Sequence, residues 1–259
     1  ILLILFISLS LGYHSNVYAY YDPSYNYSYW RNSVAAPEAY EATQIIDGKS
    51  LGVGSLKEPI DIYVLNNESV YILDSGNNRI IVTDTDFNLI RIIDSFDNNG
   101  QIDYFSNPQG IFVTERRHIY VADTGNKRVV QLDDKLKVVT IIDSPESEIL
   151  PQNFEFKPAK IVVDKAGRIY VMAIGVFDGF MEFSPDGVFT TFIGANRVKV
   201  DPIEYLWKLL STREQRSQMV QFVPTEFTNL DIDEDGFIYA VSVDNTDEDV
   251  KRLNAQGID

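Results

Sequence analysis

The chain has 259 residues, enough for one large domain or two ordinary ones, and 45% of them are apolar, so it can fill a sizeable hydrophobic core. Its formal net charge of −16 argues against nucleic acid or an anionic membrane surface as a partner, because both attract basic patches. The chain has no cysteine and two histidines, which excludes disulfides, thiolate nucleophiles, cysteine-bound zinc and multi-histidine metal centres.

The N-terminal segment is apolar from Ile1 to about Gly12 and reaches a small-residue site at Val17-Tyr18-Ala19. This pattern predicts a secretory signal peptide over residues 1–19, cleaved after Ala19. The alternative is an uncleaved membrane anchor, since an apolar run of about 20 residues spans a bilayer. In both cases we expect the rest of the chain to lie outside the cytoplasm, secreted or associated with the cell surface.

A tyrosine-rich segment follows over residues 20–41. Its aromatic residues stand among Asp, Ser, Asn and Pro, and they are Tyr20, Tyr21, Tyr25, Tyr27, Tyr29 and Trp30. The segment shows no periodicity of a helix or strand, so we expect an extended linker. Stacked aromatic side chains that bind sugars or cell-wall polymers are the alternative interpretation.

An internal repeat dominates the chain from about residue 42 onward. Residues 59–64 (PIDIYV) are echoed by 108–113 (PQGIFV), 158–163 (PAKIVV) and 227–232 (FTNLDI). In every copy a Val or Ile follows the central Ile or Leu at an offset of eight residues and precedes a tyrosine; the tyrosines are Tyr71, Tyr120, Tyr170 and Tyr239. A constant offset in four copies indicates a repeated structural unit.

Each unit is predicted to hold four short β-strands. The first alternates apolar residues, the second contains the tyrosine, and the third and fourth are residues 79–82 and 89–93 in the first copy and 128–132 and 138–142 in the second. Turns rich in Asn, Asp and Gly separate them. Four-stranded units at this period are typical of propeller blades, which must stack on one another because a lone blade cannot bury both faces. The predicted fold class is therefore all-β, a β-propeller of four-stranded antiparallel blades.

Two segments carry a family resemblance. Residues 74–79 (DSGNNR) and 123–128 (DTGNKR) resemble the D-[ST]-G-N-x-R signature of NHL repeats, and the upstream Pro-x-x-Ile and Ile-Tyr-Val elements are similar to the same pattern. The resemblance spans about residues 42–259, is strong in two copies and weakens in the third and fourth. It implies a propeller that has six blades when complete, of which about four are present here, so we expect this propeller to be incomplete at its C-terminus.

We expect the repeated motif residues to serve the scaffold, because a site that recurs once per blade is usually structural. Glycine can supply a positive φ in a tight turn, asparagine can bond turn backbone, and arginine can hold the aspartate in a charge-assisted pair. The residues are Asp74, Gly76, Asn77 and Arg79 in the first copy and Asp123, Gly125, Asn126 and Arg128 in the second.

Residues 201–222 depart from the repeat. Ile203, Leu206, Trp207 and Leu210 recur at helical spacing, and residues 211–214 (STRE) form a capping box for a second helix. Insertions in repeat proteins often map to the binding face. We therefore expect a helical hairpin here, with Tyr205, Trp207, Leu210 and Arg213 as candidate partner- or ligand-binding residues; a hairpin that merely covers the propeller is the alternative.

The signals for metal binding and catalysis are weak. Asp244, Asp247 and Asp249 form an acidic loop that is a candidate cation site, and residues 231–236 (DIDEDG) match the opening of a calcium loop but also the strand–turn–strand pattern of the repeat. His118 lies in a turn with no neighbouring nucleophile. No catalytic residue is predicted.

A non-catalytic binding or scaffold module that contacts a protein or carbohydrate at the cell surface is the function the sequence favours. We expect a monomer with no cofactor, no nucleic-acid partner and no membrane contact beyond the N-terminal segment. The alternative is a metal-dependent lactone hydrolase similar to gluconolactonases, which share the general propeller architecture and would require a calcium ion at the channel mouth. The sequence offers no residue-by-residue match to that metal site.

Overall fold

The computed structural model of the chain describes residues 25–36, 43–147, 149–150, 154–194, 227–242 and 250–254. The chain divides into two compact units, Ile1–Ile45 and Ile46–Asp259. The second unit contains the repeats. Among its described residues the regular structure is β-strand, apart from two single-turn 3₁₀ helices, η1 (Ser75–Asn77) and η2 (Thr124–Asn126).

Each repeat forms one antiparallel sheet whose strands are neighbours in sequence order. The first blade comprises β3 (Pro59–Leu65), β4 (Ser69–Asp74), β5 (Arg79–Thr83) and β6 (Leu89–Ile93). The second comprises β9 (Gly110–Val113), β10 (Ile119–Asp123), β11 (Arg128–Leu132) and β12 (Val138–Ile142). The third comprises β13 (Pro158–Val163), β14 (Ile169–Ala173), β15 (Phe180–Phe183) and β16 (Phe189–Ile193). Three strands of the fourth are described, β17 (Phe227–Ile232), β18 (Ile238–Ser242) and β19 (Val250–Leu253).

The repeated tyrosines occupy equivalent positions in these sheets. Tyr71, Tyr120, Tyr170 and Tyr239 lie in the second strand of successive blades and oppose the same position of the first strand, occupied by Tyr63, Phe112, Val162 and Asp231. The prediction that the Ile/Val-Tyr runs are equivalent strands is confirmed. β-branched and aromatic residues fill them because such side chains pack well on a pleated, half-buried surface.

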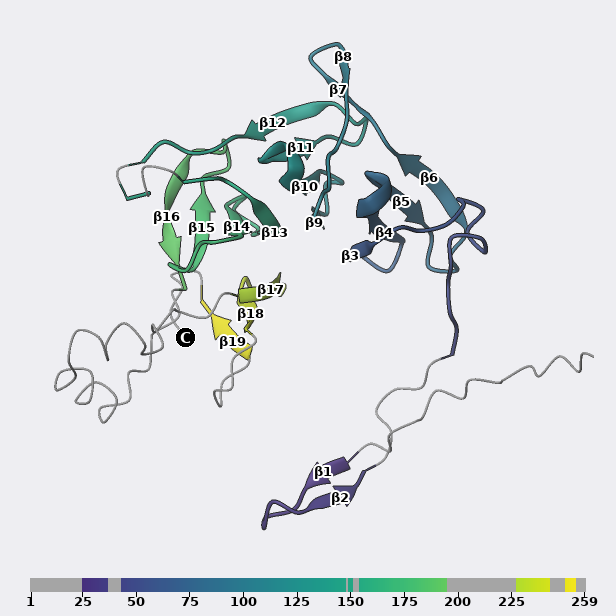
Figure 1. Cartoon of the computed structure of the whole chain (residues 1–259), viewed down its shortest axis with the longest axis vertical. Helices are drawn as coiled ribbons and strands as arrows, with labels where there is room; N and C mark the ends of the chain where they lie inside the picture. The colour runs from purple at the N-terminus through teal and green to yellow at the C-terminus, as the bar shows by residue number, and fades with distance from the viewer. Residues whose placement is uncertain are drawn as a thin grey trace, which may run out of the picture. The chain divides into compact units, whose positions relative to one another are not determined.

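The four blades stand in a propeller arrangement. Their first strands contact one another in succession, β3 with β9, β9 with β13 and β13 with β17. These innermost strands line the concave side of the second unit, and the last strands β6, β12 and β16 lie on its outer side (Figure 1). The predicted all-β propeller is therefore present, and the described residues form four of its blades.

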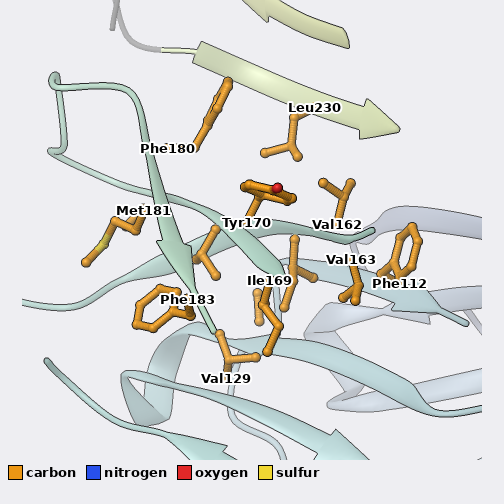
Figure 2. Close-up of a cluster of buried hydrophobic side chains, with 14 of the residues drawn as sticks. Phe112, Val129, Val162, Val163, Ile169, Tyr170, Phe180, Met181, Phe183 and Leu230 are labelled. Carbon is orange, nitrogen blue, oxygen red and sulfur yellow. The ribbon is translucent and has the colours of Figure 1, made fainter. Parts of the chain in front are cut away.

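The core lies between blades. Alternate residues of each strand point to opposite faces of the sheet, so each blade contributes one apolar face to each neighbour. Val129 of the second blade packs toward Ile169 and Phe183 of the third, and Tyr170 and Phe180 of the third meet Leu230 of the fourth (Figure 2). Burial of such side chains contributes about 1.5–3 kcal/mol each, so stacking of blades is the main stabilising term.

The first blade keeps one apolar face partly open. Ile60, Ile62 and Val64 of β3 are exposed, Ile62 at 60%, whereas Ile111, at the position equivalent to Ile62 in the second blade, is 4% exposed under the first blade. The outer part of the same face is covered by Leu51 and Val53, which pack on β4 and β5. The described chain thus places no blade against β3 on this side.

Among the residues that the structure describes, two hairpins lie outside the blades. β1 (Tyr25–Tyr27) pairs with β2 (Ser33–Ala35), so the segment predicted as an extended linker contains a β-hairpin instead. The strands form because a tight turn held by Ser28 and Asn32 closes on itself, a signal that periodicity over three residues cannot reveal. The second hairpin, β7 (Phe96–Asn98) with β8 (Gln101–Asp103), lies between the first and second blades in sequence.

The predicted helical hairpin over residues 201–222 lies outside the described residues, as does the signal segment over residues 1–19. Both remain predictions.

Candidate functional site

The motif of the first blade forms a buried ion pair where β4 gives way to β5. The Asp74 carboxylate is fully buried, and its Oδ2 accepts hydrogen bonds from Arg79 Nε at 2.7 Å and Asn77 Nδ2 at 2.8 Å. Its Oδ1 accepts from the backbone N–H of Lys57 at 2.7 Å. Arg79 also donates to the carbonyl of Val53 at 3.0 Å. Both carboxylate oxygens are used by the scaffold, so the motif ties the incoming loop to the blade.

The second blade repeats this arrangement and extends it. Asp123 accepts from Arg128 Nε at 2.8 Å, from Asn126 at 2.9 Å and from the backbone N–H of Ser106 at 2.7 Å. Arg128 also pairs with Asp103 at 2.9 Å. The hydrogen bond from Arg128 lowers the pKa of Asp103. Burial by itself would lower the pKa of Arg128, but the two carboxylates beside it outweigh that effect, so the pKa of Arg128 is raised. Charge-assisted bonds of this kind are about twice as strong as neutral ones.

The motif glycines are required for space and not for a left-handed backbone. The positive φ of each turn belongs to Asn78 (53°) and Lys127 (56°), so the expectation that Gly76 and Gly125 supply it is wrong. A Cβ on Gly76 would lie 2.7 Å from a loop carbonyl oxygen, and one on Gly125 would lie 2.5 Å from that of Ser106. The loop entering each blade runs so close to the turn that only a hydrogen fits between them.

Polar side chains link neighbouring blades at the end where the innermost strands begin. The backbone N–H of Asn107 donates to Asn78 Oδ1 at 2.7 Å, and the side-chain Oδ1 of Asn107 accepts from Ser75 at 3.2 Å and from Gln109 at 3.1 Å. At the next junction Thr124 donates to the carbonyl of the following blade's first residue. These groups satisfy one another, and their role is to hold the blades in register.

An ion pair crosses the second blade at the same end. Lys160 Nζ of β13 lies 3.0 Å from Asp61 Oδ1 of β3, although the two blades are separated by β9. Asp61 Oδ2 accepts from the backbone N–H of Ile111 at 2.9 Å, so three innermost strands meet at this carboxylate. Gly110 stands between them, and a Cβ there would lie 2.5 Å from the carbonyl oxygen of Ala159. Asp61 and Lys160 neutralise each other, so the pair fastens blades and offers no net charge to a ligand.

Further along the innermost strands Tyr63 stacks edge-on against Phe112, with ring centroids 4.9 Å apart. Burial, together with the charges of Asp231 and Glu115, raises the pKa of Tyr63 to about 12. A phenol with this pKa stays protonated at physiological pH, so it can act as a hydrogen-bond donor but not as a base.

The calcium-like segment of the fourth repeat is used by its own turn. Asp233 Oδ1 accepts from the backbone N–H groups of Asp235 at 3.0 Å and Phe237 at 2.9 Å, and Oδ2 accepts from the Tyr239 hydroxyl at 3.0 Å. Asp164 does the same in the third repeat. Because the carboxylate is engaged in both repeats, the turn interpretation accounts for this segment without an ion.

His118 is half-buried and not isolated. Its Nδ1 lies 3.1 Å from Gln131 Nε2, and Gln131 is 7% exposed. Gln131 Oε1 is the buried side-chain oxygen that has no hydrogen-bond partner among the described residues. The Thr114 hydroxyl accepts a hydrogen bond from the backbone N–H of His118 at 3.2 Å and not from its ring. Gln131 opposes Tyr120, which belongs to the core between the second and third blades, so the His118–Gln131 pair is part of the packing there.

Large exposed aromatic side chains gather on the hairpin β1–β2. Tyr29 and Trp30 are 89% and 78% exposed, and Tyr25 and Tyr27 are more than half exposed. The segment Tyr25–Ala35, from the start of β1 to the end of β2, is called the aromatic hairpin below. Large apolar side chains are also exposed at the hairpin β7–β8, namely Ile102 of β8 and Tyr104, which directly follows β8. Asp97 and Lys135 line a hollow beside that hairpin.

The candidate binding residues predicted from the insertion lie outside the described residues. They are Tyr205, Trp207, Leu210 and Arg213, and the same holds for the acidic-loop candidates Asp244, Asp247 and Asp249. Within the part of the chain that the structure describes, no group of three or more His, Asp or Glu side chains is placed to hold a metal ion. No helix among those residues is long and apolar enough to cross a membrane.

The sequence reasoning did not single out Asp61, Gly110 or Lys160. A signal was available, because the three residues occupy the third position of the repeated six-residue segment that begins with proline. A polar or absent side chain in an otherwise apolar innermost strand indicates contact between blades, but the pairing of the first blade with the third follows only from their arrangement in space.

A family model described as NHL repeat matches residues 105–132, which cover the loop before β9 and the strands to the end of β11. The chain therefore carries an NHL repeat within a four-bladed propeller arrangement. No curated protein matches the sequence.

Solved structures that resemble this chain include a catalytically inactive variant of virginiamycin B lyase from Staphylococcus aureus, at 10% identity and a TM-score of 0.46, covering 87% of this chain and 57% of that one. A streptogramin B lyase matches at 14% identity and a TM-score of 0.46, covering 78% of this chain and 53% of its own. A Bacteroides caccae protein of unknown function matches at 10% identity and a TM-score of 0.37, covering 75% and 60%. This chain spans less than two thirds of the length of these structures.

Proposed function

We propose that this chain is a non-catalytic binding module that acts outside the cytoplasm and contacts a protein or a carbohydrate. The observation that carries the proposal is that the repeated polar side chains are buried, whereas a group of aromatic side chains is exposed. The repeated polar residues, Asp74 and Asp123 above all, are turned into the scaffold, whereas exposed aromatic side chains stand on hairpins outside the blades.

Single exposed apolar residues are ordinary on protein surfaces, but contiguous groups of them mark interaction sites. Tyrosine and tryptophan supply large, rigid contact areas with a polar edge and are enriched where proteins bind partners. Four such residues in one short hairpin fit this pattern. Within the second unit the stacked blades form a rigid base that displays loops and the hairpin β7–β8.

The experiment compares binding with turnover in one preparation. The purified chain is assayed for hydrolysis of simple lactones with and without EDTA, for calcium binding by calorimetry, and for retention on insoluble polysaccharides and on a panel of defined surface proteins. We expect retention without hydrolysis. Lactone turnover that EDTA abolishes would overturn the proposal and favour the metal-dependent hydrolase.

Location outside the cytoplasm rests on residues 1–19 and has its own test. Fusing residues 1–19 to a reporter that folds only after export should give an active reporter. An inactive reporter in the cytoplasm would remove this part of the proposal.

A further inference from the structure

The aromatic hairpin presents its rings in two edge-to-face pairs. Tyr29 and Trp30 have ring centroids 4.9 Å apart at 85°, and Tyr25 and Tyr27 have centroids 5.6 Å apart at 88°. Tyr25 and Tyr27 project from the same face of β1 because they are two residues apart in a strand. With all four rings more than half exposed, flat ring surfaces remain open to solvent. A ring face carries partial negative charge and attracts the partly positive C–H groups of a ligand.

The turn that displays Tyr29 and Trp30 is held by its own hydrogen bonds. The backbone N–H of Ser28 donates to the carbonyl of Asn32 at 2.9 Å, and the backbone N–H of Arg31 donates to the carbonyl of Ser28 at 2.9 Å. Ser28 Oγ accepts from the backbone N–H of Asn32 at 3.2 Å. The rings are therefore displayed by an ordered turn, which lowers the entropy lost when a ligand binds.

Hydroxyl groups accompany the rings. Ser33 opposes Tyr27 across the hairpin, on the same face of the two strands, and the tyrosines carry hydroxyl groups themselves. Apolar faces combined with a few polar groups form the usual composition of a small-molecule binding surface. A pyranose ring matches this composition because it has an apolar C–H face and a rim of hydroxyls.

Charge discriminates among possible ligands. Residues 25–36 contain Arg31 as their single charged side chain, while the whole chain carries a formal charge of −16. Anionic polymers and anionic lipid surfaces are repelled by that total charge, whereas a neutral polymer is not. The hairpin also lies in the compact unit Ile1–Ile45, separate from the blades, so its rings are not part of the propeller core.

We infer that the aromatic hairpin is a carbohydrate-binding element that recognises a neutral polysaccharide through the faces of Tyr29 and Trp30, with Tyr25 and Tyr27 extending the surface. The inference rests on the proposed binding function and names its ligand class.

Binding of the purified chain to microcrystalline cellulose, insoluble chitin and insoluble xylan, measured by depletion from solution, tests the inference. We expect saturable binding to at least one of the three. The double variant Tyr29→Ala, Trp30→Ala should bind about tenfold more weakly or worse, because the loss of two aromatic contacts at about 0.5–1.5 kcal/mol each corresponds to roughly that factor. The double variant Tyr29→Phe, Trp30→Phe keeps the rings and should bind within about threefold of the parent.

Ile45→Ala is the matched control, since Ile45 is 90% exposed in the same unit but lies outside the hairpin. Its binding should equal that of the parent. All variants should keep the parent Tm, because the substituted side chains are exposed.

Each contrary result has a distinct meaning. Binding to none of the three polysaccharides, or binding that the double alanine variant does not weaken, overturns the inference. Retention on phosphatidylcholine vesicles, lost in the alanine variant, would assign the rings to a membrane surface and overturn it as well. In both cases the proposed binding function stands if a defined surface protein is still retained, and it falls if no surface protein is retained or if lactone turnover is found.

Discussion

A polar pair, called the polar clamp below, lies at one end of the second strand in the first two blades and at the other end of that strand in the last two. In the first two, an aspartate at the end of the second strand pairs with an arginine at the start of the third, as in Asp74–Arg79 and Asp123–Arg128. In the third and fourth, an aspartate in the turn after the first strand accepts from the hydroxyl of the repeated tyrosine, as in Asp164–Tyr170 and Asp233–Tyr239.

This difference shows which features of a repeat are needed for the blades to stack and which can vary. The spacing of the apolar strands is kept in all four blades because the faces must stack, whereas the polar clamp changes position. Where the turn has Asp164 or Asp233, the first two blades have Leu65 and Thr114. Buried polar groups must find hydrogen-bond partners, but a pair that meets this need can join adjacent strands at either end. The position of the pair can therefore vary between blades.

The largest effect is expected from removing the buried aspartates. Asp74→Ala should lower the free energy of unfolding by about 3–5 kcal/mol, because it leaves Arg79 partly buried without an acid. Asp123→Ala should cost less, since Arg128 keeps Asp103. Urea denaturation measures both, and Asp86→Ala on an exposed turn serves as the control. Equal losses for Asp74→Ala and Asp123→Ala would show that the second acid does not compensate.

A smaller loss is expected at the motif glycines. Gly125→Ala should lower the free energy of unfolding by about 1–3 kcal/mol, because its Cβ would strike the carbonyl oxygen of Ser106. Gly125→Asn should be at least as damaging. At Gly100, where φ is 86° and the space is open, Asn should be tolerated better than Ala, since asparagine adopts the left-handed region more readily. If Asn rescued Gly125, the spatial explanation would be wrong.

In the last two blades the hydroxyl of the repeated tyrosine can be removed alone. Tyr170→Phe and Tyr239→Phe should each cost about 1 kcal/mol of unfolding free energy, the usual net value of one hydrogen bond. Tyr71→Phe and Tyr120→Phe are matched controls from blades whose turns have no such aspartate, and they should cost less. Similar losses at all four positions would contradict the proposed shift of the clamp.

The smallest effect concerns acid stability of the second blade. Because the folded-state pKa of Asp103 lies below its ordinary value of 3.8, its ionised form stabilises the fold above pH 3.8, and this contribution is lost as the pH falls through the folded-state pKa. Asp103 is partly exposed, so the term is below about 1 kcal/mol. Asp103→Asn should therefore flatten the decline in urea midpoint as the pH falls from about 4 to about 2. An unchanged decline would assign acid sensitivity to other carboxylates.

Much of the fold follows from local patterns. Apolar alternation, the tyrosine offset and the turn residues place every strand of the first two blades within a residue or two, as with Arg128–Leu132 and Val138–Ile142. The Asp–Asn–Arg motif could be assigned to the scaffold because its members lie within six residues and meet through one turn. The hairpin at Tyr25–Ala35 escaped this reasoning, since strands of three residues carry too few alternations to be recognised.

The sequence by itself determined the blades, because each is built from contacts between neighbours in the chain. Only the tertiary structure decided what happens between blades. The pairing of Asp61 with Lys160 across Gly110 and the exposure of Ile62 where Ile111 is buried both depend on which sheet stands beside which. Local propensity determines where strands and turns form, but it holds no information on residues about 100 positions apart. The packing of apolar faces brings such residues together once the blades have formed.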